Sequence, residues 1–328
     1  MTMKTLLPRL AMGLAALGVF LGGASAGAAP PQAVAGPPAG FRIAGYLPDY
    51  RMDLVARIDG SGSFAGLTDL VLFSAEPSPS GSLDVARLAR TPWAELRQWK
   101  QRHSLRLILA VGGWQRSAHF AGLARSADMR RVFVESAVTF CEREQLDGLD
   151  FDWEHPRDAE EEAGYGQLLR EVHAACRPRE LVVSVTIAPW QHLPQDTWVA
   201  VDWVQVMAYD HEGRHATLPA ARQDISTLIQ AGVPVQKLVL GLPFYGRGIQ
   251  RPDQTLSYQQ IVEQHTVARE SDEIGDLYYN GPETLCRKVQ FAREAGLAGV
   301  MIWELGQDAP GDKSLLAEIL RAVGKSNR

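Results

Sequence analysis

The sequence contains little cysteine and no excess of basic residues. Its 328 residues include only Cys141, Cys176 and Cys286, too few for a fold that depends on disulfide bonds. Cys141 and Cys176 lie in segments with helical patterns, and we expect buried free thiols there, although one disulfide between them stays open. The net charge of -5 and a pI near 5.9 provide no basic surface for nucleic acid or anionic lipid. We therefore expect no nucleic-acid partner.

The sequence also lacks an apolar run long enough to span a bilayer, which requires about 20 residues. An apolar run over residues 11–21 follows Lys4 and Arg9 and precedes an A-x-A pattern at residues 24–26. This order is typical of a secretory signal peptide. We predict a signal peptide over residues 1–26, which implies a secreted or periplasmic protein without a membrane anchor after cleavage.

Residues 27–40 are rich in Pro, Ala and Gly and are predicted to form a linker. The folded part, residues 41–325, shows no internal repeat and no change of composition that would mark a second domain. Within it, short β-type segments alternate with helical patterns such as those from Met129 and Pro282. The eight strand candidates begin at Phe41, Thr68, Leu105, Leu146, Leu181, Trp203, Lys237 and Leu297.

Eight strands, each followed by a helix, predict an α/β fold of the (β/α)8 TIM barrel type. A doubly wound open sheet is the alternative, but no G-x-G-x-x-G turn follows the first strand. The longest gap between strands, residues 246–296, contains an additional helical pattern in "SYQQIVEQHTVARE" before the one that starts at Pro282. We interpret this gap as an elaborated loop with one extra helix, too short for a full-size α+β insertion domain.

The segment "LDGLDFDWEHP" (146–156) alternates acidic and large apolar residues. Because side chains alternate along a strand, Asp150, Asp152 and Glu154 share one face, about 6–7 Å apart from one to the next. In a barrel this face points to the axis, where Val, Ile or Leu are usual, at the carboxyl end of the strand where active sites lie. Three carboxylates so close together raise at least one pKa and supply a proton donor.

Two other interpretations of this row are weaker. A solvated charged loop does not require regular alternation with apolar residues. Three carboxylates could hold Mg²⁺ or Ca²⁺, but no His or Asn flanks them at a recognisable metal-ligand spacing. We therefore expect neither a metal nor another cofactor.

The sequence "DGLDFDWE" resembles the D-G-x-D-x-D-x-E signature of glycoside hydrolase family 18, the chitinase family. Other motifs of this family recur in order, one at each of several strand ends. They are "LAVGGW" (109–114), "VMAYD" (206–210), "GLPFYGR" (241–247) and "GVMIWELGQD" (299–308). Because these motifs occur in the family's order, the whole folded part of the chain resembles a member of this family.

The resemblance implies a substrate-assisted glycosidase, in which the acetamido group of the substrate is the nucleophile. Glu154 would then be the general acid and base. Asp152 would hold the acetamido N–H, Asp150 would share charge or a proton with Asp152, and Asp147 would support the strand. Tyr209 would donate its hydroxyl to the acetamido oxygen.

The resemblance also implies residues that bind the sugar. Asp210 would bond to sugar hydroxyls, Met207 would line the acetamido pocket, and Trp303 would form the floor of the central subsite. Trp114 and Tyr46 are candidate walls. Trp303, Met207 and Tyr46 are also compatible with ordinary barrel core, where large side chains are common. For Tyr209 and Asp210 the alternative is a buried structural pair.

Two positions depart from the family pattern. Ala110 replaces a Ser whose hydroxyl would support Asp150, so this carboxylate needs another partner or has a different protonation bias. His155 replaces a Tyr that often follows the catalytic Glu, and it either fills the space of that ring or makes activity more sensitive to pH. We favour the first interpretation.

The segment "HEGRH" (211–215) matches the H-E-x-x-H pattern of zinc proteases. That chemistry needs both His on one face of a helix. Gly213 interrupts the run, and the segment directly follows a predicted strand. We therefore predict a loop without zinc.

The sequence predicts a secreted, retaining hydrolase of β-1,4-linked N-acetylglucosamine, acting on chitin or chito-oligosaccharides, and we expect a monomer. The short insertion favours an open groove and endo action. An endo-β-N-acetylglucosaminidase of N-glycans, or a peptidoglycan or exopolysaccharide hydrolase, is the alternative. A non-catalytic, lectin-like sugar-binding protein is a further one, although such relatives usually lose one of the acids. The optimum pH stays open.

Overall fold

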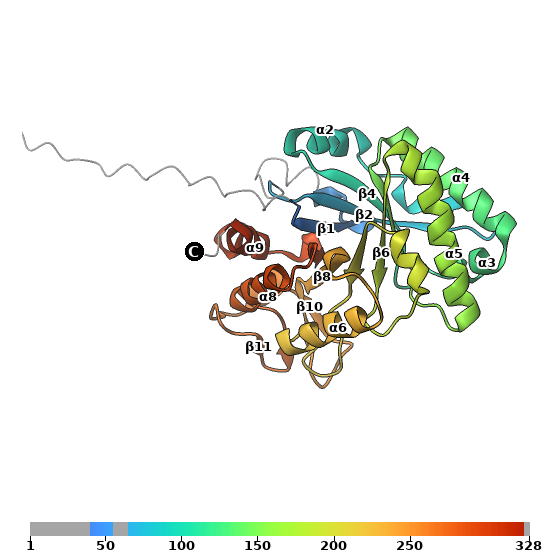
Figure 1. Ribbon diagram of the computed structural model, residues 1–328. Coiled ribbons are helices and arrows are strands. Elements are labelled where there is room, and N and C mark those ends of the chain that lie inside the picture. The colour runs from blue at the N-terminus through green and yellow to red at the C-terminus, as the bar shows by residue number, and fades with distance from the viewer. Residues whose placement is uncertain (1–39, 55–64, 325–328) are drawn as a thin grey trace, which may run out of the picture. The chain divides into compact units, whose positions relative to one another are not determined.

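The computed structural model describes residues 40–54 and 65–324, and Figure 1 shows these as a ring of strands surrounded by helices. The predicted signal peptide and all but the last residue of the predicted linker lie outside the described residues. Among the helices of the described ranges, none is long and apolar enough to cross a membrane.

Eight parallel strands form a closed barrel, as predicted. Neighbouring strands pair in the order β1, β13, β8, β7, β6, β5, β4 and β2, and β1 also pairs with β2 to close the ring. Every strand overlaps the segment predicted for it. The bounds are β1 Arg42–Pro48, β2 Asp69–Pro77, β4 Arg106–Gly112, β5 Gly148–Asp152, β6 Val182–Ile187, β7 Trp203–Val206, β8 Leu238–Pro243 and β13 Gly299–Trp303.

Helices pack around the barrel, and two of them confirm the patterns seen in the sequence (Figure 1). In α4 the N-cap Ser126 accepts a hydrogen bond from the N–H of Met129. In α8, Pro282 occupies the first turn, where its missing N–H costs nothing. The bounds are α2 Trp93–His103, α3 Phe120–Arg125, α4 Ala127–Glu144, α5 Ala159–Cys176, α6 Leu218–Gln230, α8 Pro282–Glu294 and α9 Leu315–Gly324.

The outer face of β5 anchors this strand under three helices. Phe151 meets Phe133 of α4 edge-on, with ring centroids 6.0 Å apart. Trp153 stacks on Phe120 of α3 at 5.3 Å and meets Tyr165 of α5 at 5.2 Å. Because the apolar half of the alternating segment is buried in this way, its acidic half must face the barrel axis.

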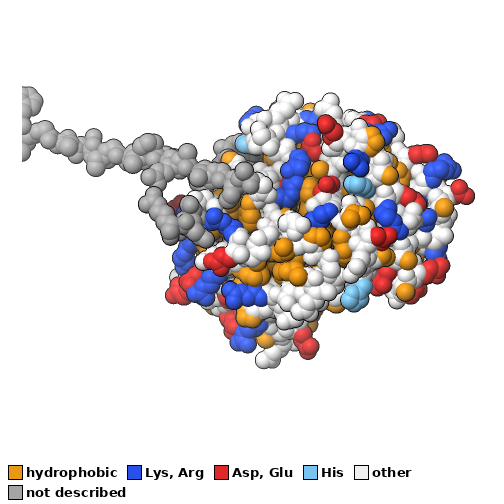
Figure 2. Space-filling view, in the orientation of Figure 1, with side chains coloured by type: hydrophobic (Ala, Val, Ile, Leu, Met, Phe, Trp, Pro, Cys, Tyr) orange, Lys and Arg blue, Asp and Glu red, His pale blue; other side chains and the backbone are white. Residues whose placement is uncertain are grey.

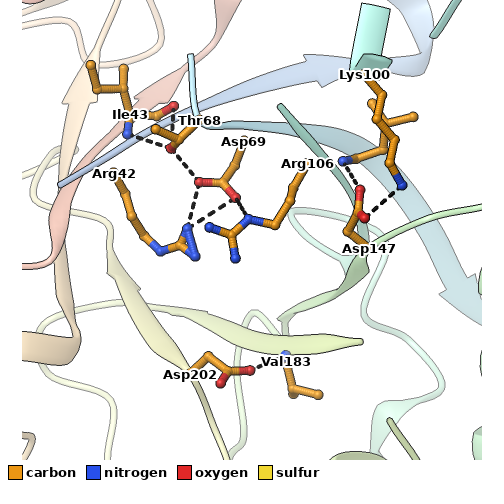
Figure 3. A network of polar contacts seen from close by, with 10 residues as sticks. Arg42, Ile43, Thr68, Asp69, Lys100, Arg106, Asp147, Val183 and Asp202 are labelled. Carbon is orange, nitrogen blue, oxygen red and sulfur yellow. Dashed lines mark hydrogen bonds and ion pairs between the residues drawn. The ribbon is translucent and has the colours of Figure 1, made fainter. Parts of the chain in front are cut away.

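The first residues of several strands close the amino-terminal end of the barrel with charge (Figure 3). Asp69 is 1% exposed and accepts hydrogen bonds from Arg42 Nη1 at 2.9 and 3.2 Å. Arg106 Nε lies 3.2 Å from the same carboxylate. The Arg42 guanidinium carbon lies 3.4 Å from the centroid of the Trp203 ring, a cation–π contact. This layer fills the bottom of the barrel with paired polar groups.

Asp147 supports the start of the neighbouring strand, as predicted (Figure 3). Its carboxylate accepts a hydrogen bond from the N–H of Leu107 at 2.8 Å. It also forms an ion pair with Lys100, whose Nζ lies 2.7 Å from Asp147 Oδ1. Asp202 does the same for Val183, whose N–H lies 2.7 Å from Asp202 Oδ2. Both carboxylates thus bind backbone groups where strands enter the barrel.

The segment between β8 and β13 is more ordered than we predicted. It contains α7 (Tyr258–Gln264), the predicted helix, which begins with a capping box formed by Ser257 and Gln260. It also contains a four-stranded antiparallel sheet in the order β10, β9, β12, β11. These strands are too short for a visible alternation in the sequence: β9 Tyr245–Gly248, β10 Thr255–Ser257, β11 Glu273–Ile274 and β12 Leu277–Tyr278.

The single strand predicted from Lys237 is therefore two strands in different sheets. β8 ends at Pro243 and β9 begins at Tyr245, so the chain leaves the barrel at Phe244, which is fully buried. A second short addition, β3 (Leu83–Asp84), pairs antiparallel with the end of β2. Both additions lie at the carboxyl ends of barrel strands.

Cys141 of α4 and Cys176 at the end of α5 are buried thiols without a disulfide in the described part of the chain. Burial raises the pKa of both thiols, of Cys176 to about 12, so both stay protonated. The buried free thiols confirm the prediction made from their helical surroundings.

Figure 2 shows charged side chains of both signs around the edge of one face of the molecule and hydrophobic side chains gathered near the middle of that face.

We predict that Asp69→Ala lowers the free energy of unfolding by about 3–5 kcal/mol, because it leaves the buried Arg42 without its counterion. Urea unfolding monitored by circular dichroism measures this change. As a control, Glu135→Ala breaks the exposed Arg131–Glu135 pair on α4 and should cost less than about 1 kcal/mol. Equal losses in the free energy of unfolding would show that the buried pair of Asp69 and Arg42 stabilises the fold no more than an exposed ion pair does.

Candidate active site

The row of carboxylates stands at the carboxyl end of β5. Asp150 and Asp152 belong to the strand, and Glu154 follows two residues after Asp152. The neighbouring strand approaches this end closely because Gly112 lies opposite Asp152, with φ of +100°. A Cβ atom at Gly112 would lie 2.3 Å from the carbonyl oxygen of Asp152. The glycine of "LAVGGW" therefore lets β4 and β5 meet beneath the site.

Asp150 is completely buried and accepts hydrogen bonds from four side chains. Oδ1 accepts from Ser184 Oγ at 2.6 Å and Gln205 Nε2 at 2.9 Å, and Oδ2 accepts from Tyr46 Oη at 2.7 Å and Thr186 Oγ1 at 2.9 Å. A carboxylate has about four lone-pair sites. Every one of these sites has a donor, which offsets the cost of burying the group.

These donors supply the support for Asp150 that the side chain of Ala110 cannot give. Ala110 lies directly opposite Asp150 on β4 and offers no hydroxyl. Ser184 occupies the opposite position on the other neighbouring strand, β6, and its hydroxyl makes the shortest contact with Asp150. The missing hydroxyl on one side is thus replaced from the other side.

Asp152 lies above Asp150, is 3% exposed, and has an Oδ1 atom without a hydrogen-bond partner among the described residues. Burial raises the pKa of Asp152 well above its ordinary value, and the charges of Glu154 and Asp150 raise it further. The protonated form is therefore favoured, and the free oxygen is available to a ligand.

Glu154 stands at the edge of the site, with a side chain 14% exposed. Burial raises its pKa to about 7, the nearby Asp210 raises it as well, and a hydrogen bond from the N–H of Trp114 lowers it in part. The side chain of His155 lies beside it, with Nε2 3.7 Å from Glu154 Oε2. A carboxyl group that titrates near neutral pH can both give and take a proton.

Tyr209 and Asp210 follow β7. Asp210 has a left-handed backbone (φ +65°) and is held by β9: Tyr245 Oη donates to its Oδ1 at 2.7 Å, and Arg247 Nη1 lies 3.1 Å from the same atom. Burial opposes ionisation of Asp210, but contacts with His215 and Tyr245 and the charge of Arg247 lower its pKa. Burial raises the pKa of Tyr209, so its hydroxyl keeps its proton.

These side chains surround one cleft of about 970 Å³. Of the residues that the sequence predicts for the site, all except Asp150 line the cleft, and Asp150 lies directly beneath. The insertion forms part of the wall with β9, β10 and α7. The predicted lining residues are Tyr46, Trp114, Asp152, Glu154, Met207, Tyr209, Asp210 and Trp303, and the insertion adds Tyr245, Arg247, Thr255, Leu256, Ser257 and Gln260.

The aromatic residues predicted for sugar binding differ in exposure. Trp114 is 68% exposed at the rim, whereas Tyr46 is 1% exposed and its hydroxyl is engaged with Asp150. Trp303 and Met207 are half-buried. Trp303 meets Phe73 edge-on at 4.8 Å and Tyr46 at 5.5 Å. Tyr46 therefore belongs mainly to the polar network, and Trp303 and Trp114 present surface to a ligand.

The sequence analysis missed several residues of this site. Ser184, Thr186 and Gln205 supply hydrogen bonds to Asp150, and Tyr50 and Trp190 stand at the rim with 58% and 59% exposure. Alternation within strands could have revealed the first three, because "VVSVTI" and "WVQV" place polar residues on the inward face. Nothing in the sequence distinguished the two rim aromatics from core residues.

The "HEGRH" segment lies in the loop after β7, as predicted, and does not form the helix that a zinc protease motif requires. His211 Nε2 contacts Asp224 Oδ2 of α6 at 2.9 Å, while His215 packs against Tyr245 with ring centroids 5.1 Å apart. Within the described ranges, no group of three or more His, Cys, Asp or Glu side chains could hold a metal ion. The two histidines thus support the loop that carries Asp210.

The arrangement combines a proton donor, a buried carboxyl group with a free oxygen and flat aromatic surfaces in one groove. Aromatic faces bind the C–H faces of sugar rings, and an acid with a pKa near neutral pH can protonate the oxygen of a glycosidic bond. The geometry is therefore suited to cleaving a bound saccharide.

Comparisons with known proteins agree with this geometry. The class V chitinase of Arabidopsis thaliana is 28% identical over 293 residues, covering 70% of this chain and 77% of that protein. A plant class V chitinase mutant from Cycas revoluta, solved in complex with (GlcNAc)3, superposes with a TM-score of 0.74 at 26% identity, covering 86% and 99% of the two chains. The chitinase-like agglutinin of Robinia pseudoacacia also has a TM-score of 0.74, at 25% identity, covering 85% and 98%.

The family model described as "Glycosyl hydrolases family 18" matches residues 50–308. This range begins just after β1, spans the barrel strands from β2 to β13 and includes the row of carboxylates. The chain belongs to glycosyl hydrolase family 18 and is a chitinase-like glycoside hydrolase.

Proposed function

We propose that this protein hydrolyses β-1,4-linked N-acetylglucosamine in chitin or chito-oligosaccharides, with retention of the anomeric configuration. The observation that carries the proposal is the complete row of Asp150, Asp152 and Glu154 along and just after β5, with Glu154 open to the cleft. The chitinase relatives and the neighbour that binds (GlcNAc)3 support the choice of substrate.

Glu154 acts first as the acid. Its pKa of about 7 keeps much of it protonated at neutral pH, so it can transfer a proton to the glycosidic oxygen as the bond from that oxygen to the anomeric carbon breaks. The acetamido oxygen of the substrate attacks the same carbon and forms an oxazolinium ion. Glu154, now ionised, takes a proton from a water molecule, whose oxygen attacks the anomeric carbon from the side of the departed group. The bond between this carbon and the acetamido oxygen breaks, so the oxazolinium ring opens and the original configuration is restored.

Asp152 orients the nucleophile. Its free Oδ1 accepts the acetamido N–H, and this contact favours the charge that develops on the acetamido group. Asp150, fixed by four donors, provides the negative charge beneath Asp152. Tyr209 donates its hydroxyl to the acetamido oxygen, Met207 lines the pocket for the methyl group, and Asp210 binds sugar hydroxyls.

The cleft favours endo action on a chain that lies across the barrel. The sheet between β8 and β13 forms one wall, but its strands have only two to four residues, so the wall is low. Trp303 forms the floor of the central subsite, Trp114 stands at the rim, and the buried Tyr46 packs against Trp303. A low wall admits internal positions of a polymer as well as its ends.

A second candidate function is sugar binding without hydrolysis. The likeness to the agglutinin of Robinia pseudoacacia favours it, because this neighbour superposes as well as the plant chitinase does. The intact acids argue against it for this chain, since catalysis needs Glu154 and Asp152 and binding does not.

The first prediction concerns substrate and acid together. The wild-type protein is expected to hydrolyse chito-oligosaccharides in preference to a high-mannose N-glycopeptide or peptidoglycan. Glu154→Gln should lose about 10²- to 10⁴-fold in kcat, because the amide cannot transfer a proton. Product analysis by mass spectrometry and reducing-end assays measures both effects.

The matched control is Glu160→Gln on α5, an exposed glutamate outside the cleft, which should keep full activity. Cleavage of the glycopeptide or peptidoglycan alone would keep the mechanism but change the substrate. Binding of sugars without turnover of any of them would favour the agglutinin-like function.

The second prediction concerns pH. Because the acid form of Glu154 is needed, kcat/KM should fall as pH rises through about 7, the pKa of this group. Asp210→Asn removes a charge that raises this pKa, so the alkaline limb of the profile should move to lower pH. The pH profile of kcat/KM for both proteins measures the shift, and an unchanged limb would contradict the coupling of the two groups.

We further propose that the protein is exported as a monomer by its predicted signal peptide. Expression in a secreting bacterial host should yield a mature protein that begins at Gly27, because the A-x-A pattern ends at Ala26. N-terminal sequencing measures the cleavage point. Retention of residue 1 in the exported fraction would contradict the prediction.

A further inference from the structure

Three large aromatic side chains are well exposed in the described part of the chain, and all three line the cleft. They are Tyr50, Trp114 and Trp190, with 58%, 68% and 59% exposure. Exposed aromatic side chains gathered along one groove are typical of a ligand-binding surface. Trp190 follows the end of β6, a strand adjacent to β5, which carries the acid. Neither the motifs nor the proposed mechanism assigns it a role.

A chain of contacts links Trp190 to the acid. The ring of His155 lies 4.6 Å from the ring of Trp190 at 63°, an edge-to-face contact. On its other side, His155 Nε2 lies 3.7 Å from Glu154 Oε2. Trp190 therefore stands one imidazole ring away from the carboxyl group that gives the proton.

The orientation of His155 is fixed by Gln191. His155 Nδ1 lies 3.3 Å from Gln191 Oε1, and Gln191 Nε2 donates to the carbonyl oxygen of Trp153 at 3.4 Å. Gln191 is 4% exposed, so it is held within the protein. Because Gln191 directly follows Trp190, the same loop sets both the platform and the imidazole that supports it.

We propose that Trp190 forms a stacking subsite for the sugar ring next to the bond that Glu154 protonates, and that His155 is the positioning residue of this subsite. The inference rests on the proposed function and extends it. The ligand is a β-linked N-acetylglucosamine ring, whose axial C–H groups form flat apolar faces that pack on indole. His155 holds the indole at a fixed angle, so the sugar is bound beside the acid with little loss of side-chain freedom.

The test measures binding of chitohexaose by calorimetry in Glu154→Gln, since this background separates binding from turnover. Adding Trp190→Ala should weaken the affinity roughly threefold to tenfold, the range expected for one aromatic stack. Trp190→Phe should keep part of the affinity, and Trp190→Leu should lose it like Ala, because Leu is apolar but has no flat face. Val199→Ala, an exposed apolar residue outside the cleft lining, is the matched control.

A double-mutant cycle tests the role of His155. His155→Ala should weaken binding by about the same factor as Trp190→Ala, and the two together should be no weaker than Trp190→Ala alone. His155→Tyr, which restores an aromatic edge, should recover most of the affinity. Additive losses from the two substitutions would show that His155 does not position Trp190 and would overturn that part of the proposal.

The outcomes separate this inference from the proposed function. If the wild-type protein cleaves chitohexaose and Trp190→Ala or Trp190→Leu binds it as well as the parent does, the subsite is wrong and the function stands. If the wild-type protein neither cleaves nor binds chitohexaose, both are wrong. Unfolding temperatures within a few degrees of the parent confirm that the variants are folded.

Discussion

The site depends on one buried carboxylate that is fully bonded. Asp150 lies inside the barrel, where an unpaired charge would cost several kcal/mol. Hydrogen bonds from β1, β6 and β7 converge on it through Tyr46, Ser184, Thr186 and Gln205. Only a closed ring of strands can bring donors from so many directions to one point. Burial raises the pKa of the neighbouring Asp152, the charge of Glu154 raises it further, and the charge of Asp150 adds to both.

The barrel interior is arranged in layers of different chemistry. The lowest layer pairs Asp69 with Arg42 and Arg106, and the middle layer satisfies Asp150. The upper layer leaves atoms free, since Asp152 Oδ1 has no partner within the described ranges. The lower layers therefore contribute stability, while a carboxyl oxygen free to bind a ligand stands at the open end, where the active sites of TIM barrels lie.

The sequence was sufficient to predict the barrel, the carboxylate row and eight of the residues that line the cleft. Its eight strands are long enough for their apolar patterns to show, and the acids of β5 stand out because inward barrel positions are normally apolar. The insertion sheet was missed because β11 and β12 have two residues each and depend on pairing with distant segments. Trp190 was missed because a sequence does not distinguish an exposed indole from a buried one, and its exposure is decided by which loops stand beside it.

The insertion sheet has a further consequence for how this groove can change. Tyr245 and Arg247 hold Asp210 from β9, the first strand of the insertion, immediately after β8 ends. Residues 252–257 brace this anchor, because the carbonyl oxygen of Pro252 accepts from Arg247 Nε at 2.8 Å and β10 pairs with β9. Residues 265–271, after α7, make no such contact with Asp210 or β9 in the described part of the chain. Extra residues inserted there would raise the wall of the groove while the anchored aspartate kept its place. Groove depth and catalytic geometry are thus encoded in separate parts of the same insertion, so selection or design can alter the preferred polymer without rebuilding the reaction centre.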